Sequence, residues 1–256
     1  MRVVIKIGTS TLTHATGNLN IRRVEALCKA ISDVKNAGNE VILVSSGAIG
    51  MGVGKLGLRE RPSDVPTKQA AAAVGQCELM YFYDKIFGEY HHIVAQLLIT
   101  GEDIASHTRH ENFRNTLNRL LALGALPIIN ENDTVGTKEI VIGDNDTLAA
   151  IVAESVQADL LILLSDIDGL YTADPRKDPN ARLLHRITHL DDSVRALAGG
   201  CGSSRGTGGM VTKLQAAQIC MDCGCDMVIA NGNNPDNLYE ILEGKDVGTR
   251  FTEEQK

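Results

Sequence analysis

The sequence predicts an α/β fold in which helices cover both faces of a mostly parallel sheet. Short runs of β-branched and aliphatic residues alternate with longer segments whose apolar residues recur at helical spacing, an order typical of parallel sheets with helical crossovers. The run LLILLS at residues 160–165 has no polar alternation, as expected of a strand buried on both faces. No internal repeat, linker or low-complexity block divides the chain, so we expect one domain over residues 1–256.

The expected elements follow one another along the chain in that order. Strands are predicted at residues 3–7, 41–45, 93–99, 126–130, 160–165 and 227–230. After the first strand, apolar residues from Ile21 to Val34 repeat at helical spacing and Gly38 is placed to end the helix. Helices are also predicted over residues 67–90, 110–123 and 147–156, the last after a short strand-like run at 140–143. The turn-rich segment 168–181 predicts a long loop at the carboxyl end of a strand, a usual place for a ligand.

The composition argues against several classes of function. The 256 residues are 43% hydrophobic with a net charge of −7, and neither Lys nor Arg forms a run, so we expect no nucleic-acid or membrane-surface partner. No stretch approaches the roughly 20 apolar residues of a membrane helix, and the N-terminus enters a strand without the regions of a signal peptide. We therefore expect a cytoplasmic protein.

The six cysteines indicate reduced thiols rather than a disulfide framework, because no signal peptide precedes them. Cys220, Cys223 and Cys225 lie close together, and Cys201 would be a fourth ligand for a zinc ion. The first two, however, fall near the end of an amphipathic helix, and Cys225 follows its Gly224 stop. We expect these cysteines to be small buried apolar side chains and predict no metal ligands in the chain.

A glycine-rich segment at residues 206–213, GTGGMVTK, runs into a helix-like stretch. It brings Lys213 and free backbone N–H groups to one helix start, where a polyphosphate would bind. The segment is not a Walker A loop, because Lys213 follows Thr212 instead of a glycine and precedes Leu214 instead of Ser or Thr. A flexible surface loop with a solvated lysine is the alternative.

A second glycine pattern at residues 52–57 matches G-x-G-x-x-G. It begins well after its strand, and no strand that ends in an acidic residue follows about 20 residues later. We therefore do not expect a dinucleotide site or a Rossmann-type dehydrogenase.

Further polar groups fall where the predicted strands end, which is where such sheets build a binding crevice. Lys6 lies in an otherwise apolar strand and is costly there unless it meets a negative partner; an edge-strand lysine that reaches water is the alternative. The small-residue turn at 45–50 would let a substrate approach backbone N–H groups. Carboxylates and amides cluster at 130–133 and 144–146. Each cluster alone is typical of a helix N-cap, whereas together they could hold a substrate ammonium or orient lysines.

The segments VVIKIGTS, SSGAIG, INENDTV, GDND, SDIDGLYTADP and GTGGMVTK together resemble the amino acid kinase family, in the family's order and over nearly the whole chain. The resemblance implies an open αβα sandwich whose N-terminal half binds L-glutamate and whose C-terminal half binds ATP, with Mg²⁺ accompanying the nucleotide. It also implies phosphorylation of the glutamate side-chain carboxylate to L-glutamyl 5-phosphate, the first step of proline synthesis.

The resemblance assigns roles to individual positions. Lys6 and Lys213 would contact the transferred phosphoryl group, with Asp146 orienting both, and Gly8 and Gly47 would supply backbone N–H groups near it. Residues implied to bind glutamate are Ser46, Asp133 and Asn145. Residues implied to bind ATP, besides the two lysines, are Ser165, Asp166, Thr207, Gly208, Gly209, Met210, Val211 and Thr212. No general base is needed, because the side-chain carboxyl of glutamate, with a pKa near ~4.3, is already ionised at pH 7.

The resemblance also implies partners and leaves alternatives. It implies a homo-oligomer, a dimer or tetramer, and proline as a feedback inhibitor that shares the α-carboxylate and ammonium of glutamate. Many similar chains continue into a C-terminal PUA domain, whereas this sequence ends soon after GTRF. We therefore expect the short form of the protein, which is the form without the PUA domain. The alternatives are a member of the family that acts on acetylglutamate or UMP, and a non-catalytic sensor of nucleotide or amino acid on the same fold.

Overall fold

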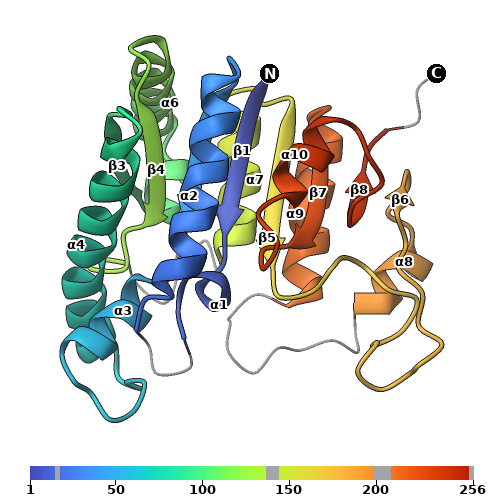
Figure 1. Cartoon of the computed structure of the whole chain (residues 1–256), viewed down its shortest axis with the longest axis horizontal. Coiled ribbons are helices and arrows are strands. Elements are labelled where there is room, and N and C mark those ends of the chain that lie inside the picture. Colours follow the sequence, from blue (N-terminus) through green and yellow to red (C-terminus); the bar gives the residue numbers. More distant parts are fainter. Residues whose placement is uncertain (15–17, 137–143, 199–208, 254–256) are drawn as a thin grey trace.

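An eight-stranded, mostly parallel sheet forms the centre of the molecule (Figure 1), in the order β3-β4-β2-β1-β5-β7-β8-β6. The computed structural model describes residues 1–14, 18–136, 144–198 and 209–253. The strands are β1 (Arg2–Ile7), β2 (Glu40–Ser45), β3 (Val94–Ile99), β4 (Leu126–Glu131), β5 (Leu160–Ser165), β6 (Arg186–Ile187), β7 (Asp226–Asn231) and β8 (Thr249–Phe251). All adjacent pairs are parallel except β7 with β8. The predicted α/β fold with a mostly parallel sheet is therefore confirmed.

Strand β1 is central, because it pairs with β2 on one side and with β5 on the other. Lys6, its penultimate residue, lies opposite Val44 and Leu163. The alternative of an edge-strand lysine is therefore wrong. The carboxyl ends of neighbouring parallel strands meet at one edge of a sheet, which is the edge toward which β1 points, next to α1 and α3 in Figure 1.

Helices cover both faces of the sheet (Figure 1). The helices are α1 (Thr9–Leu12), α2 (Ile21–Asn36), α3 (Ala48–Lys55), α4 (Val65–Glu89), α5 (Gly101–Ala105), α6 (His107–Ala122), α7 (Asn145–Ser155), α8 (Asp192–Leu197), α9 (Met210–Asp222) and α10 (Asn237–Leu242). One apolar core contains side chains from α2, α4 and α10, and the other contains side chains from α6, α7 and α9. No helix in the described part of the chain is long and apolar enough to cross a membrane.

The longer elements agree with the sequence pattern to within a few residues. Helix α2 begins at Ile21, and Gly38 follows its end with a φ of 94°, a left-handed conformation that glycine adopts without strain. Strands β6 and β8 and the short helices α1, α5, α8 and α10 were not predicted, because they are too brief to show a periodic pattern. Helix α3 was not predicted either, because its repeated glycines give no helical signal. The strand-like run at 140–143 lies outside the described residues.

Two glycines allow α3 and α4 to cross with their backbones in contact. A Cβ atom added to Gly52 would lie 1.8 Å from the carbonyl oxygen of Ala71, and one added to Gly75 would lie 1.7 Å from that of Ala48. Side chains larger than hydrogen therefore do not fit at either position. The G-x-G-x-x-G match at residues 52–57 is thus explained by helix packing, with Gly57 at a φ of 64° after the helix.

We expect Gly75→Ala to destabilise the fold. The added methyl group meets backbone atoms that cannot rotate away, and overpacking of this kind costs about 1–3 kcal/mol, or a melting temperature lower by roughly 3–10 °C. Gly88→Ala is the matched control in the same helix, since no atom lies within 4 Å of its added Cβ, and it should leave stability unchanged or raise it. Thermal unfolding followed by circular dichroism measures both. Equal melting temperatures for the two variants would contradict the close crossing.

Candidate active site

One buried aspartate joins two lysines at the carboxyl edge of the sheet. Lys6 Nζ lies 2.7 Å from Asp146 Oδ1, and Lys213 Nζ donates a 2.9 Å hydrogen bond to Asp146 Oδ2. The hydroxyl of Thr212 also donates to Oδ2, at 3.1 Å. Asp146 is 1% exposed, and both lysines are buried except for a small fraction of their surface. The structure thus brings together three residues that are separated by up to 207 positions.

The two ammonium groups determine the charge state of the aspartate. Burial alone would raise the pKa of Asp146, but the positive charges of Lys6 and Lys213 outweigh it and lower the pKa from 3.8 to about 2. Asp146 is therefore ionised at neutral pH. The cluster holds two positive charges and one negative charge, and this excess of positive charge in a poorly hydrated site favours an anionic guest.

Each member of the cluster is held by a separate element. Lys6 comes from β1, Asp146 from the first turn of α7, and Lys213 from the first turn of α9, with α7 packed on α9. Asp144 caps α7, because its Oδ1 accepts hydrogen bonds from the N–H groups of Asp146 and Thr147 at 2.7 and 3.0 Å. The N-cap interpretation thus holds for Asp144 and not for Asp146, whose side chain is left to contact the lysines.

A polar network lies beside this cluster, where β2 and β4 end. Asn145 Nδ2 lies within hydrogen-bond distance of Ser46 Oγ at 2.7 Å, Asn130 Oδ1 at 3.0 Å and the carbonyl of Ser45 at 3.2 Å. Asn130 Nδ2 in turn donates to Gln76 Oε1 at 2.9 Å. The three atoms around Asn145 Nδ2 are oxygens that can accept from its two N–H groups, and Nδ2 cannot itself accept, so the hydroxyl proton of Ser46 remains available to donate to a ligand.

Asp133 follows β4 by two residues and is half-buried. Burial raises the pKa of its carboxyl, and the nearby charge of Arg61 partly opposes that effect. A partly desolvated carboxylate of this kind gains from a cationic partner. Asp133, Asn145 and Ser46, which the sequence analysis assigned together, thus all lie near the ends of β2 and β4 or at the start of α7.

The start of α9 has the features of an anion site. Gly209 is its N-cap and provides no side-chain hydrogen bond, so the first N–H groups, from Met210 onward, have no capping side chain. Ser165 ends β5 and donates a 3.3 Å hydrogen bond to Asp166. Thr207 and Gly208 lie outside the described residues.

The two glycines assigned to the moving phosphoryl group differ in conformation. Gly47 caps α3 with a φ of 103°, a left-handed value that requires glycine. A Cβ atom on Gly8 would lie 3.6 Å from Lys6 Nζ, which places this residue beside the lysine cluster. Its N–H makes a long 3.4 Å hydrogen bond to the carbonyl of Leu164, so this N–H points at β5 in the structure described here.

The three clustered cysteines lie at the end of α9 and the start of β7. Cys220 and Cys225 are buried, as expected, whereas Cys223 is exposed, so the prediction of a buried side chain is wrong for Cys223. Contact between Cys225 and Cys220, with burial, raises the pKa of the Cys220 thiol. No group of three or more Cys, His, Asp or Glu side chains in the described ranges is arranged to hold a metal ion. Cys201, the fourth ligand of the zinc alternative, lies outside those ranges.

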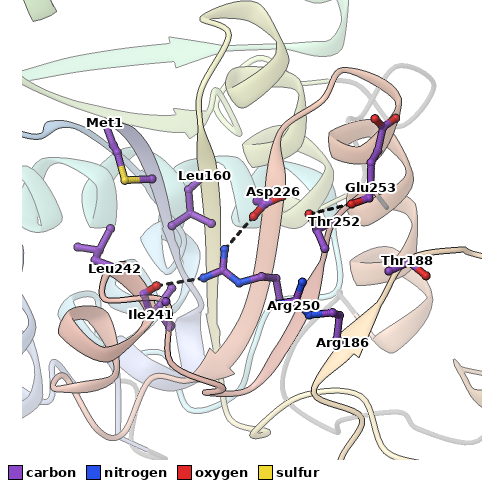
Figure 2. Close-up of a pocket in the computed structure, with 11 residues that line it drawn as sticks. Met1, Leu160, Arg186, Thr188, Asp226, Ile241, Leu242, Arg250, Thr252 and Glu253 are labelled. Carbon is purple, nitrogen blue, oxygen red and sulfur yellow. Dashed lines mark hydrogen bonds and ion pairs between the residues drawn. The ribbon is translucent and has the colours of Figure 1, made fainter. Parts of the chain in front are cut away.

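A cavity of about 600 Å³ lies at the opposite edge of the sheet from the lysines. Met1, Leu160 and Asp226, which line it, stand at the amino ends of β1, β5 and β7. Figure 2 shows Arg250 in this cavity between Asp226 and the carbonyl of Ile241, to which it donates at 2.9 and 3.0 Å. The guanidinium group of Arg250 is therefore already paired inside this cavity. We place the candidate active site at the lysine cluster instead.

No individual role in the site was predicted from the sequence for Asp144, Asn130 or Gln76. Asp144 and Asn130 lie inside the segments GDND and INEND, so the signal for them was present. Gln76 lies in the middle of α4, 54 residues from its partner Asn130. No motif pointed to it, because only the packing of α4 on the sheet brings it to the site.

The chain is similar to known proteins of one family over most of its length. A family model described as the amino acid kinase family matches residues 1–231. The chain is 51% identical over 254 residues to a glutamate 5-kinase of Clostridium perfringens, covering 98% of this chain and 94% of that protein. It is 52% identical to a glutamate 5-kinase of Clostridium acetobutylicum, covering 100% and 96%. A third, from Carboxydothermus hydrogenoformans, is 53% identical, but the match spans only 68% of its length.

Solved structures share the fold at lower identity. Carbamate kinase from Giardia lamblia bound to AMP-PNP superposes with a TM-score of 0.69 at 18% identity, covering 99% of this chain and 98% of that one. Isopentenyl phosphate kinase of T. acidophilum gives a TM-score of 0.68 at 20% identity, covering 98% and 100%. From the family match and the relatives that are about half identical over nearly its whole length, we conclude that the chain belongs to the amino acid kinase family and, within it, to the glutamate 5-kinases.

Proposed function

We propose that this protein transfers the γ-phosphoryl group of ATP to the side-chain carboxylate of L-glutamate, giving L-glutamyl 5-phosphate and ADP, the first step of proline biosynthesis. The buried cluster of Lys6, Asp146 and Lys213 is the observation that carries the proposal, and membership of the family supports it. We further propose one amino acid kinase domain over residues 1–256, with glutamate in the N-terminal half and ATP in the C-terminal half.

The two lysines are suited to stabilise charge during the transfer. Phosphoryl transfer requires mainly alignment of the groups and stabilisation of charge on the phosphoryl oxygens. Asp146 holds both ammonium groups on its two oxygens, so both are oriented before any substrate binds. Lys6 would contact the phosphoryl group from the glutamate side and Lys213 from the nucleotide side. The N–H groups of Gly8 and Gly47 would approach the same group once a ligand draws Gly8 away from Leu164.

The uncapped start of α9 supports nucleotide binding by Gly209, Met210, Val211, Thr212 and Lys213. We propose that Ser165 and Asp166, at the end of β5, line the same side. Mg²⁺ fits this chain as a companion of the phosphates, since the described residues offer no cage of acidic side chains and Mg²⁺ is commonly held through substrate phosphates. When bound, Mg²⁺ supplies charge neutralisation at those oxygens.

Glutamate would bind among Ser46, Asn145 and Asp133. The hydroxyl of Ser46 is free to donate to a carboxylate, because its oxygen accepts from Asn145. Asp133 would accept from the α-ammonium in a charge-assisted hydrogen bond. This acceptor favours free glutamate over acetylglutamate or UMP, neither of which carries an ammonium group. The intact lysine cluster favours an enzyme over a non-catalytic sensor.

We also propose that proline competes for the glutamate pocket, since it carries the same α-carboxylate and ammonium, and that the protein works in the cytoplasm. A homo-oligomer, dimer or tetramer, is a further part of the proposal. Ile93 precedes the edge strand β3 and Leu123 precedes its neighbour β4, and they are 72% and 63% exposed, which supports burial of this side of the sheet in an assembly.

A substrate panel tests the proposed reaction. Purified protein is incubated with ATP, Mg²⁺ and hydroxylamine, which converts an acyl phosphate to a stable hydroxamate. We expect hydroxamate with glutamate and little with acetylglutamate, and we expect UMP to stimulate no ADP release. Acetylglutamate turned over as fast as glutamate would refute the substrate assignment, and no ADP release with any acceptor would favour the sensor.

Lys6→Ala and Lys213→Ala should each lower kcat by roughly a hundredfold or more, because each removes charge stabilisation at the transferred group. Thermal stability should stay near that of the wild type, since Asp146 keeps one lysine partner in either variant. Asp146→Asn should lower kcat similarly and also lower stability, because two buried ammonium groups then face each other. Lys55→Ala, which removes an exposed lysine paired with Glu78, is the control. A lysine variant with wild-type kcat would be removed from the mechanism.

Asp133→Ala should raise the KM for glutamate steeply, by about tenfold or more, while the KM for ATP changes little. The reason is the loss of the acceptor for the α-ammonium. Asp84→Ala, at an exposed acid on α4, serves as the matched control and should behave as wild type. Steady-state kinetics with each substrate varied in turn measures the effect. A parallel rise in both KM values would indicate a general disturbance of the site and contradict the assignment.

A further inference from the structure

Gln76 carries a buried amide donor that has no partner. The residue is 7% exposed, and its Oε1 accepts from Asn130 Nδ2 at 2.9 Å. Its Nε2 makes no hydrogen bond to any part of the chain that the structure describes. An unpaired buried amide is unfavourable, because the group has lost its water without gaining a replacement.

A backbone group fixes which end of the Gln76 amide is unpaired. The N–H of Glu131 donates to Asn130 Oδ1 at 2.9 Å, and a backbone N–H can only donate. Asn130 must therefore present its Nδ2 to Gln76, and the atom of Gln76 that receives it must be the oxygen. The same Oδ1 lies 3.0 Å from Asn145 Nδ2, the end of that amide that also faces the carbonyl of Ser45, which is consistent with this orientation.

The position of Gln76 is rigid and lies beside the proposed glutamate pocket. Its neighbour Gly75 packs directly on the backbone of Ala48, the residue that begins α3 immediately after Gly47. Through Asn130 and Asn145, Gln76 is also connected to Ser46. The unpaired amide therefore belongs to the wall formed by the turn after β2 and the end of β4.

The unpaired amide donor in this wall indicates which group of the substrate would bind there. An N–H₂ donor is complementary to an anion and unfavourable for a cation. Of the three charged groups of glutamate, the side-chain carboxylate must reach the lysines, and the ammonium requires an acceptor such as Asp133. Resting on the function proposed above, we propose that Gln76 is a further specificity-determining residue, whose Nε2 donates a hydrogen bond to the substrate α-carboxylate alongside the hydroxyl of Ser46.

Two substitutions separate direct contact with substrate from support of Asn130. Gln76→Met removes both the donor and the acceptor at similar side-chain length. Gln76→Glu keeps an oxygen that can accept from Asn130 Nδ2 but replaces the donor with negative charge. We expect both to raise the KM for glutamate about tenfold or more, with the larger effect in Gln76→Glu, while the KM for ATP stays unchanged. Gln218→Met, which alters a glutamine paired on the surface with Arg195 and Asp222, is the control.

A substrate variant provides an independent measurement. The α-amide of glutamate keeps the ammonium and the side-chain carboxylate but replaces the α-carboxylate with a neutral group that also donates. The preference of the wild type for glutamate over this amide, as a ratio of kcat/KM, should fall at least tenfold in Gln76→Glu. If Gln76→Met does not fold, as judged by circular dichroism, this ratio decides the question.

The possible outcomes are distinct. A Gln76→Glu variant with wild-type KM beside an impaired Gln76→Met would show that Gln76 only supports Asn130, and would overturn the proposal. Wild-type KM for glutamate in both variants would overturn it as well. A wild type that phosphorylates no glutamate would instead overturn the proposed function, and it would do so before any variant is made.

Discussion

The ion cluster around Asp146 is the interaction on which the rest of the site depends. Two lysine ammonium groups lie at 2.7 and 2.9 Å from the two oxygens of one carboxylate that is 1% exposed. Without that carboxylate, two buried positive charges would repel each other and remain unpaired, which is strongly destabilising. With it, each ammonium group keeps a fixed position, and the cluster still carries an excess of one positive charge. The carboxylate therefore keeps the two buried lysines from destabilising the fold, while the remaining positive charge can attract phosphate.

The same cluster links stability to pH in a defined direction. The folded-state pKa of Asp146 is about 2, below its ordinary value of 3.8. Because the pKa is lowered, ionised Asp146 contributes its full stabilisation above pH 3.8, and that contribution is lost as the pH falls through 2. Burial raises the pKa values of Asp144 and Asp133 instead. These two carboxyls therefore take up protons before Asp146 does on acidification.

Strand order and helix packing, rather than the chemistry of the polar groups, bring these groups to one edge of the sheet. A central strand supplies Lys6, and the packing of α7 on α9 sets Asp146 against Lys213. On the other side, the glycine crossing of α3 and α4 lets Gln76 reach Asn130. Local propensity explains little of this: α3 carries three glycines within eight residues, which weakens a helix, and tertiary packing compensates for that cost.

The sequence by itself determined the α/β class, the long helices and strands, and the motifs that contain most of the candidate site. Hydrophobic periodicity and glycine stops are local signals, so Ile21 to Val34 and the run 160–165 were predicted correctly from residues close in the chain. The tertiary structure decided that Lys6 is central and ion-paired, that Asp144 rather than Asp146 caps α7, and that Gln76 faces Asn130. These outcomes depend on strand order and helix packing between distant segments, and no local pattern encodes which of two chemically similar residues a distant partner will meet.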